Sequence, residues 1–127
     1  MSRTIHFWDM DHTIINNDCD VSWKEFMILK SLTGPEAREK ADYFYQQYLA
    51  ESLNINEFLR FQLDEFKGND VSTMRSLCKE HCDTLVEPNI YQQARVMIQT
   101  QREQGDLVCL VTATNRLIAE PLAAIMG

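Results

Sequence analysis

The sequence lacks the features that mark several large classes of protein. Its 127 residues contain no apolar run of membrane-spanning length and no recognisable signal peptide. Its 4 cysteines show none of the spacings of a secreted disulfide framework. Its 12 basic residues form no cluster and the net charge is −7, which argues against nucleic acid and against an anionic membrane as partners. These absences predict a protein of the cytoplasm.

The segment from Cys78 to Cys82 has residue types that occur in zinc sites, because two thiols stand four positions apart beside His81. A structural zinc site needs four ligands, and no second Cys/His pair is close in the sequence. We therefore interpret these thiols as ordinary cysteines of a reducing compartment.

Two carboxylates follow the first apolar segment of the chain. Residues 5–8 have the length of a buried strand, and Asp9 and Asp11 come directly behind them. Carboxylates are costly to bury unless they are paired or bind a cation, and open α/β sheets bind ligands at the carboxyl ends of their strands. The pattern therefore predicts a catalytic or ligand-binding site at the end of this strand. Two acids at this spacing also occur in local turns and in generic divalent-metal sites, so the motif alone leaves those alternatives open.

A second apolar segment, residues 107–111, has strand length and ends at a hydroxyl residue, Thr112. Polar residues that begin helices follow it, and either Thr114 or Asn115 is a suitable N-cap. A hydroxyl group at a strand end, with a helix N-terminus behind it, suits an anion because free N–H groups and the helix dipole favour negative charge.

The segment between Pro88 and Gly105 predicts the connection between these strands. Pro88 is placed as the first residue of a helix and Gly105 as the residue that ends it. A strand, a crossover helix and a second strand predict the parallel βαβ arrangement, with the apolar helix face packed on the sheet.

The two motifs in this order resemble those of the haloacid dehalogenase-like phosphohydrolases, in the phosphoserine-phosphatase-like branch. The resemblance implies that Asp9 is the nucleophile that forms an aspartyl phosphate and that Asp11 is the general acid and base. It implies that Asp9 and Asp11, the latter through its backbone carbonyl, hold Mg²⁺. It also implies that Thr112, with Ala113 and Thr13, binds the phosphate. We therefore expect a Mg²⁺-dependent phosphomonoester hydrolase that acts on a small phosphorylated metabolite.

The fold class that follows is α/β, with an incomplete Rossmann-like core and an inserted α-helical cap. The core of parallel strands with a βαβ crossover is expected over residues 1–15 and 86–127, and the cap over residues 16–85. The cap has no convincing strand and four amphipathic stretches, from about residues 21–32, 35–52, 54–67 and 69–82. An aromatic cluster in the second stretch is interpreted as core packing rather than as a ligand-stacking patch. It comprises Tyr43, Phe44, Tyr45 and Tyr48.

Two cap residues bear on the choice of substrate. In phosphoserine phosphatases an acid shortly after the first motif holds the amino group of serine, and Asp18 is the residue at that place here. An Arg of those enzymes binds the serine carboxylate, and this chain has Gln62 instead. Gln lacks the positive charge and the paired N–H donors with which a guanidinium binds a carboxylate. Phosphoserine itself is therefore not the expected substrate. Asp18 is equally well explained as a helix-capping residue.

The third and fourth motifs of the resembled family are absent from this sequence. Residues 113–127 follow Thr112 and contain no lysine and no acid cluster. We expect the open edge of the first strand to pair with a second copy of the chain, as a homodimer, or with a missing C-terminal half. The alternatives are a non-catalytic interaction module and a fragment of a longer phosphatase.

Overall fold

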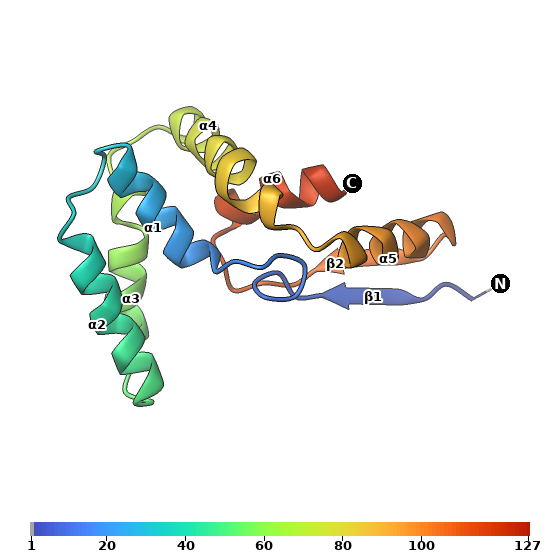
Figure 1. The fold of residues 1–127 in the computed structure, drawn as a ribbon, viewed down its shortest axis with the longest axis horizontal. Coiled ribbons are helices and arrows are strands. Elements are labelled where there is room, and N and C mark those ends of the chain that lie inside the picture. The colour runs from blue at the N-terminus through green and yellow to red at the C-terminus, as the bar shows by residue number, and fades with distance from the viewer. Residues whose placement is uncertain (1) are drawn as a thin grey trace.

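Two short parallel strands and the helix between them form the centre of the fold in the computed structural model, which describes residues 2–127 (Figure 1). Strand β1 (Ile5–Trp8) pairs with β2 (Leu107–Leu110), so that Ile5 lies opposite Leu107 and Trp8 opposite Leu110. Helix α5 (Gln92–Glu103) precedes β2 and packs against it. The predicted parallel strands with a helical crossover are confirmed.

Helices make up the rest of the described chain. None of them within residues 2–127 is long and apolar enough to cross a bilayer. They are α1 (Cys19–Leu29), α2 (Ala37–Leu49), α3 (Ile55–Gln62), α4 (Val71–His81) and α6 (Arg116–Met126), with short 3₁₀ turns η1 (Asp64–Phe66) and η3 (Glu87–Asn89) and a π-helical turn η2 (Cys82–Val86).

Side-chain caps fix where most of these helices begin. The oxygens of Asp18, Asn54, Asp70 and Asn115 accept hydrogen bonds from backbone N–H groups in the first turns of α1, α3, α4 and α6. Such caps satisfy donors that have no partner inside the helix. Gly105 follows α5 with φ +82°, a conformation that glycine adopts without strain.

The start of the crossover helix differs from the prediction. Pro88 lies in the 3₁₀ turn η3, and α5 begins only after Tyr91. The reason is tertiary: Ile90 forms an antiparallel bridge with Ile15, and the Tyr91 N–H donates to the Ile14 carbonyl (2.9 Å). Extended backbone at this point ties the loop after β1 to the crossover.

The main hydrophobic core lies on one face of the two strands. Trp8, Val108 and Leu110 turn toward it, and α5, α6, α1 and α4 supply the other side. Its fully buried members include the large side chains Trp23, Met10, Ile15, Met27, Met74 and Leu122. The loop after β1 is therefore held by core packing on both sides of its two carboxylates, Asp9 and Asp11.

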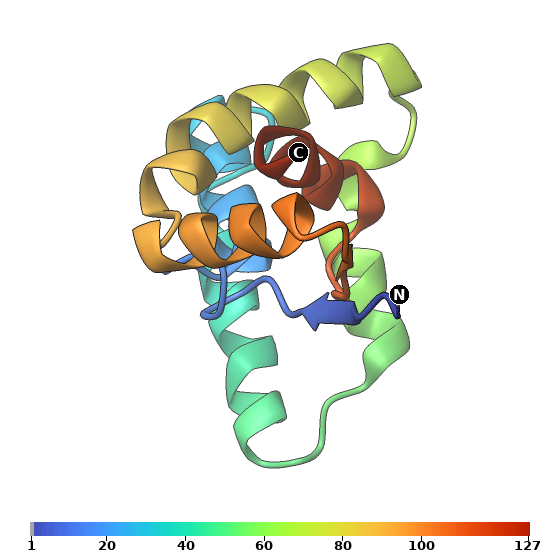
Figure 2. The same ribbon diagram turned by 90° about the vertical axis from the view of Figure 1, so that its right-hand side faces the viewer.

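The other face of the sheet is bare. Phe7 is 70% exposed, and Ile5, Leu107 and Val111 are exposed beside it. Both views show α5 and α6 on one side of β1 and β2 and no helix or strand of residues 2–127 against the opposite side (Figures 1 and 2). The expectation of a buried first strand is therefore wrong for this face, because nothing within the described chain covers it.

Helices α2 and α3 form a second, smaller cluster around Ala37, Phe44 and Phe61. The predicted core packing of the aromatic cluster holds for Phe44 alone, since Tyr43, Tyr45 and Tyr48 are more than half exposed. Helix α2 also packs against α1, which contributes Ile28 to this cluster.

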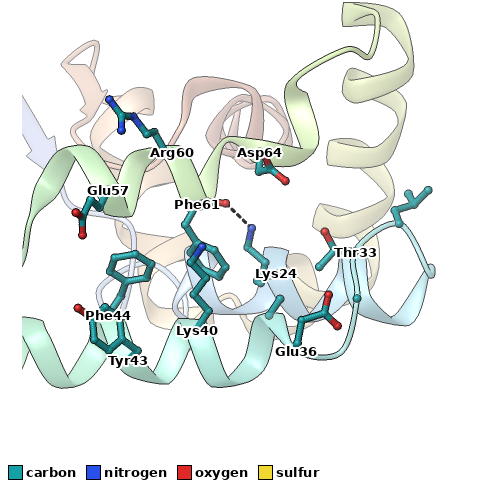
Figure 3. Close-up of a pocket in the computed structure, with 13 residues that line it drawn as sticks. Lys24, Thr33, Glu36, Lys40, Tyr43, Phe44, Glu57, Arg60, Phe61 and Asp64 are labelled. Carbon is teal, nitrogen blue, oxygen red and sulfur yellow. Dashed lines mark hydrogen bonds between the residues drawn. The ribbon is translucent and has the colours of Figure 1, made fainter.

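A buried ion pair joins this second cluster to α1. Lys24 Nζ lies 2.6 Å from a carboxylate oxygen of Glu65. It also donates to the Phe61 carbonyl at 2.8 Å, as Figure 3 shows. Both side chains are only 3% exposed, and Thr33 Oγ1 donates to the same Glu65 oxygen. Each charge is tolerated in the interior because the other neutralises it.

We predict that Lys24→Met lowers the free energy of unfolding by about 3–5 kcal/mol, because Glu65 is then a buried charge without its partner. The double variant Lys24→Met/Glu65→Leu should recover most of the loss. Urea unfolding measures both. Arg38→Met, which breaks the exposed pair with Glu25, is the matched control and should have a much smaller effect. Equal losses in Lys24→Met and Arg38→Met would contradict this account.

Candidate functional site

The carboxyl ends of β1 and β2 meet at a shallow, open depression. Because the strands are parallel, their ends lie at the same edge of the sheet. Asp9, Thr112 and Ala113 line this depression together with Phe7, Trp8 and Val111. The structure thus brings together three of the residues that the sequence assigned to catalysis and phosphate binding.

Asp9 stands at the beginning of a tight turn. Its side chain is exposed, and one carboxylate oxygen accepts the Met10 N–H at 2.8 Å. The Met10 carbonyl accepts N–H groups of the following residues, and His12 has φ +56°, a left-handed conformation that closes the turn. Thr13 is exposed and does not line the depression, so the turn separates it from Thr112.

Asp11 points from this turn to the N-terminus of α1. Its carboxylate accepts the Cys19 N–H at 3.2 Å. Burial raises the pKa of Asp11, as do the charges of Asp18 and Asp9, against the opposing effect of the Cys19 hydrogen bond. A carboxyl group with a raised pKa holds a proton closer to neutral pH, which is what a general acid requires.

The loop after β2 ends in a helix N-terminus. Thr112 Oγ1 accepts the Thr114 N–H at 3.1 Å, and Asn115, not Thr114, caps α6 by accepting the Leu117 N–H at 2.9 Å. Thr112 therefore stands between the end of a strand and the start of a helix, a place suited to an anion.

A second pocket, of about 340 Å³, lies between α1, α2 and α3. Asp18 and Gln62, the two residues that the sequence assigned to substrate binding in the cap, both line it. Asp18 also caps α1, so both of its proposed roles are compatible with this geometry.

Asp20 lines the same pocket and was missed by the sequence analysis. The Gln62 amide nitrogen lies 3.4 Å from the Asp20 carbonyl. Burial raises the pKa of Asp20 to about 6, reinforced by the charges of Asp18 and Asp11. The sequence did contain a signal for Asp20. It is an acid two positions after Asp18, and both residues stand at the start of a helix, where their carboxylates lie near each other.

A larger pocket, of about 700 Å³, lies on another side of the α2–α3 pair (Figure 3). Its lining mixes acids and bases and includes none of the motif residues. The charged members are Lys24, Glu36, Lys40, Glu57, Arg60 and Asp64. Size alone therefore does not identify the site; the depression at the strand ends holds the motif residues instead.

The donors at the depression suit a hard cation only in part. No group of three or more His, Cys, Asp or Glu side chains within residues 2–127 is placed to hold a metal. Mg²⁺ keeps several waters and takes oxygens from substrate phosphate, so one carboxylate and one carbonyl can contribute to its shell. Asp9 and the Asp11 carbonyl are oxygen donors of that kind. Cys78 and Cys82 lie in the hydrophobic core, where burial raises their thiol pKa values to about 12 and about 11.

Comparisons with known proteins support the family that these motifs resemble. The family model described as haloacid dehalogenase-like hydrolase matches residues 6–127. The chain is 26% identical over 126 residues to a protein from Neisseria meningitidis serogroup C (strain 8013) named histidinol-phosphatase. That match covers 98% of this chain and 57% of the Neisseria protein.

Two solved structures have a similar fold. A protein of unknown function from Bordetella pertussis Tohama I matches with a TM-score of 0.90 and 26% identity, over 100% of this chain and 58% of that one. A phosphoserine phosphohydrolase-like protein from Francisella tularensis matches with a TM-score of 0.64 and 14% identity, over 98% of this chain and 54% of that one. The chain thus spans 54–58% of the length of these three proteins.

We predict that Asp20→Asn stabilises the protein at pH 7 by about 1–3 kcal/mol, because a raised pKa means that ionising Asp20 opposes folding. Its folded pKa of about 6 exceeds the ordinary value of 3.8. The protonated form therefore favours folding at acid pH, and this contribution is lost as the pH rises through 6.

Urea unfolding at pH 4 and pH 7 tests this sign. The difference between Asp20→Asn and the unchanged protein should be small at pH 4 and large at pH 7. Asp42→Asn, at an exposed position of α2, is the control and should change little at either pH. A stabilisation that is the same at both pH values would show that the Asp20 charge is not its cause.

Proposed function

This chain belongs to the haloacid dehalogenase-like hydrolases, and from that premise we propose that it hydrolyses a small phosphomonoester through an aspartyl-phosphate intermediate on Asp9. The observation that carries the proposal is the meeting of Asp9 with Thr112 and Ala113 at the ends of two parallel strands. A nucleophilic carboxylate and a phosphate-binding hydroxyl are needed at one place, and the crossover puts them there.

The proposed reaction has two steps. A carboxylate oxygen of Asp9 attacks phosphorus, the bond from phosphorus to the ester oxygen breaks, and Asp11 gives its proton to the departing alcohol. Water then attacks the phosphoryl group on Asp9 and gives a proton to Asp11, which releases inorganic phosphate and restores Asp9. Thr112 and the N–H groups at the start of α6 hold the phosphoryl oxygens.

The surroundings of Asp11 support its role in both steps. Burial and the nearby carboxylates raise its pKa, which favours the protonated form that the first step needs. The Cys19 N–H fixes one of its oxygens, which leaves the other to exchange the proton. When bound, Mg²⁺ would offset the repulsion between the Asp9 carboxylate and the anionic phosphate.

The cap pocket supports a substrate with an ammonium group and without a carboxylate. Asp18 and Asp20 bring two acids to the pocket, and Gln62 brings an amide where a carboxylate would need a cation. The Neisseria relative is named for the phosphate ester of histidinol, an amino alcohol, which has this combination of groups. We propose an amino-alcohol phosphate as the substrate class.

We further propose that catalysis requires a segment that covers the bare face of β1 and β2. Phe7, Ile5, Leu107 and Val111 expose a continuous apolar surface there, and each strand has one unpaired edge. The relatives extend well beyond the part that this chain matches. The segment therefore brings an apolar strand, with an added cation that suits the charge at Asp9. A second copy of this chain is the alternative partner for the bare sheet face. In that case the chain is an interaction module.

We predict that Asp9→Asn abolishes phosphate release from amino-alcohol phosphates, with a fall of at least about a thousandfold, because an amide cannot act as the nucleophile. Phosphate release, with Mg²⁺ and with chelator, is measured on this chain together with the unmatched part of the Neisseria relative, because we propose that catalysis requires a covering segment. Asp64→Asn, at an exposed position outside the depression, is the control and should retain activity. Activity that survives in Asp9→Asn would overturn the proposed mechanism.

We predict that the chain alone self-associates and binds a hydrophobic dye, because its sheet face is apolar and uncovered. Adding the unmatched part of the Neisseria relative as a separate polypeptide should give a one-to-one complex in analytical ultracentrifugation and lower the dye signal. Phe7→Asp should prevent complex formation, whereas Val96→Asp, at an exposed position of α5, should not. A chain that stays monomeric, binds no dye and is unaffected by Phe7→Asp would exclude this interface.

A further inference from the structure

We propose that Tyr45 and Tyr48 form a wall of the substrate pocket that binds a flat ring, so that the preferred substrates carry an aromatic or heteroaromatic ring beside their ammonium group. This inference rests on the proposed function and adds the part of the substrate that is remote from the phosphate. It assigns a role to the aromatic residues that do not enter the core.

Tyr45 and Tyr48 come from one face of α2. With Ala41 they are spaced by four and three residues, which places all three side chains along the same line of the helix. All three line the 340 Å³ pocket. Phe44, on the adjacent side of α2, packs instead against Phe61 and Phe58, with ring centroids 5.3 and 5.6 Å apart.

Neither tyrosine is used by the described fold. Tyr45 is 56% exposed and Tyr48 64% exposed, and no aromatic pair or hydroxyl hydrogen bond within residues 2–127 involves them. Helix α2 would be equally well packed on α3 without these rings, because Phe44 already fills that contact. Two large aromatic side chains on the open side of a pocket are therefore available to a ligand.

The opposite wall of the pocket is acidic. Asp18 and Asp20 project from the start of α1, and no Lys, Arg or His is among the residues that line the pocket. A ligand that enters it therefore finds two carboxylates and no competing cation. A positively charged group meets both the carboxylates and the electron-rich faces of the tyrosine rings.

Gln62 adds a polar group at the buried end of the pocket. The residue is only 7% exposed, and its amide nitrogen donates to the Asp20 carbonyl. Its side-chain oxygen accepts no hydrogen bond from the described residues, although the side chain lines the pocket. A ring or ammonium N–H of the ligand would satisfy this acceptor, which points to a ligand with more than one donor.

The pocket is placed to continue the phosphate site. Asp11 is bonded to the N–H of Cys19, and Asp18 and Asp20 are the two residues on either side of Cys19. Asp11 therefore contacts the helix end from which two acids of this pocket project. The volume suits a five- or six-membered ring with a short arm.

The test measures binding of the product alcohols by calorimetry, so that it does not depend on turnover. The probes are L-histidinol and L-phenylalaninol, which carry an ammonium group and a ring, and ethanolamine, which has no ring. The ring-bearing probes should bind about tenfold more tightly than ethanolamine, as expected from a stacked ring. Tyr45→Ala/Tyr48→Ala should remove this difference and leave ethanolamine binding unchanged.

Two further variants decide between ring stacking and a general loss of structure. Tyr45→Phe/Tyr48→Phe keeps the rings and should keep the preference. Tyr43→Ala removes an exposed tyrosine of the same helix that lines the other pocket, and it should also keep the preference. The proposal is overturned if the double alanine variant retains the preference, if Tyr43→Ala loses it equally, or if no ring-bearing amine binds.

The same panel separates this inference from the proposed function. Asp9→Asn should bind L-histidinol as tightly as the unchanged protein does, because Asp9 lies outside the pocket. A tyrosine-dependent preference in a protein that releases no phosphate, even with the unmatched part of the Neisseria relative added, would support the ring pocket and refute hydrolysis by this chain. Phosphate release without any ring preference would refute the ring pocket and leave hydrolysis standing.

Discussion

The parallel pairing of β1 with β2 is the constraint on which the site depends. The hydrogen bonds from Leu107 N–H to the Thr4 carbonyl and from Val111 N–H to the Trp8 carbonyl fix the register at both ends of the pair. With that register, the first residues after each strand are adjacent although the whole cap and the crossover separate them in sequence. A shift of one residue would turn Trp8 out of the core and Phe7 into it. The core packing of Trp8 therefore also sets the position of Asp9.

The N-terminus of α1 links this edge of the sheet to the cap. Its first N–H groups donate to Asp11 and to Asp18. The carboxylate proposed for acid and base catalysis and the carboxylate proposed for substrate binding therefore contact the same helix end. Their mutual repulsion, with burial, raises the pKa values of Asp11 and Asp20. Carboxylates crowded in this way oppose folding, and a fold retains such a group where chemistry or ligand binding needs it. The buried Lys24–Glu65 pair holds α1 against α3 and so keeps Asp20 and Gln62 on one pocket.

The features that the sequence predicted are those set by local residues. Both strands, the capping position of Asp18 and the glycine that ends α5 follow from short patterns around each position, and Asn115 is one of the two caps that the sequence offered for α6. The features that it did not predict are set by distant contacts. Pro88 begins no α-helix because Ile90 pairs with Ile15, and Lys24 is buried because Glu65 neutralises it. The tyrosines of α2 have the spacing of a packed helix face, but the partner surface is absent on that side. Likewise, the placement of Asp18 beside Gln62 depends on how α1 and α3 pack, which residue spacing does not specify.

The two exposed apolar regions differ in what can satisfy them. The bare sheet face is flat and consists of aliphatic and phenyl side chains, and the strand edges beside it carry unpaired backbone. A packed helix or second sheet is needed to cover the face, and a further strand is needed to pair with an edge. The tyrosine wall is concave, has hydroxyl groups and faces carboxylates, and its helix backbone is already fully bonded. A protein strand would gain nothing there, whereas a small cationic ring fits both walls. The core half of the site therefore still needs the covering segment that we propose, while the cap already holds the groups that we propose to recognise a ligand.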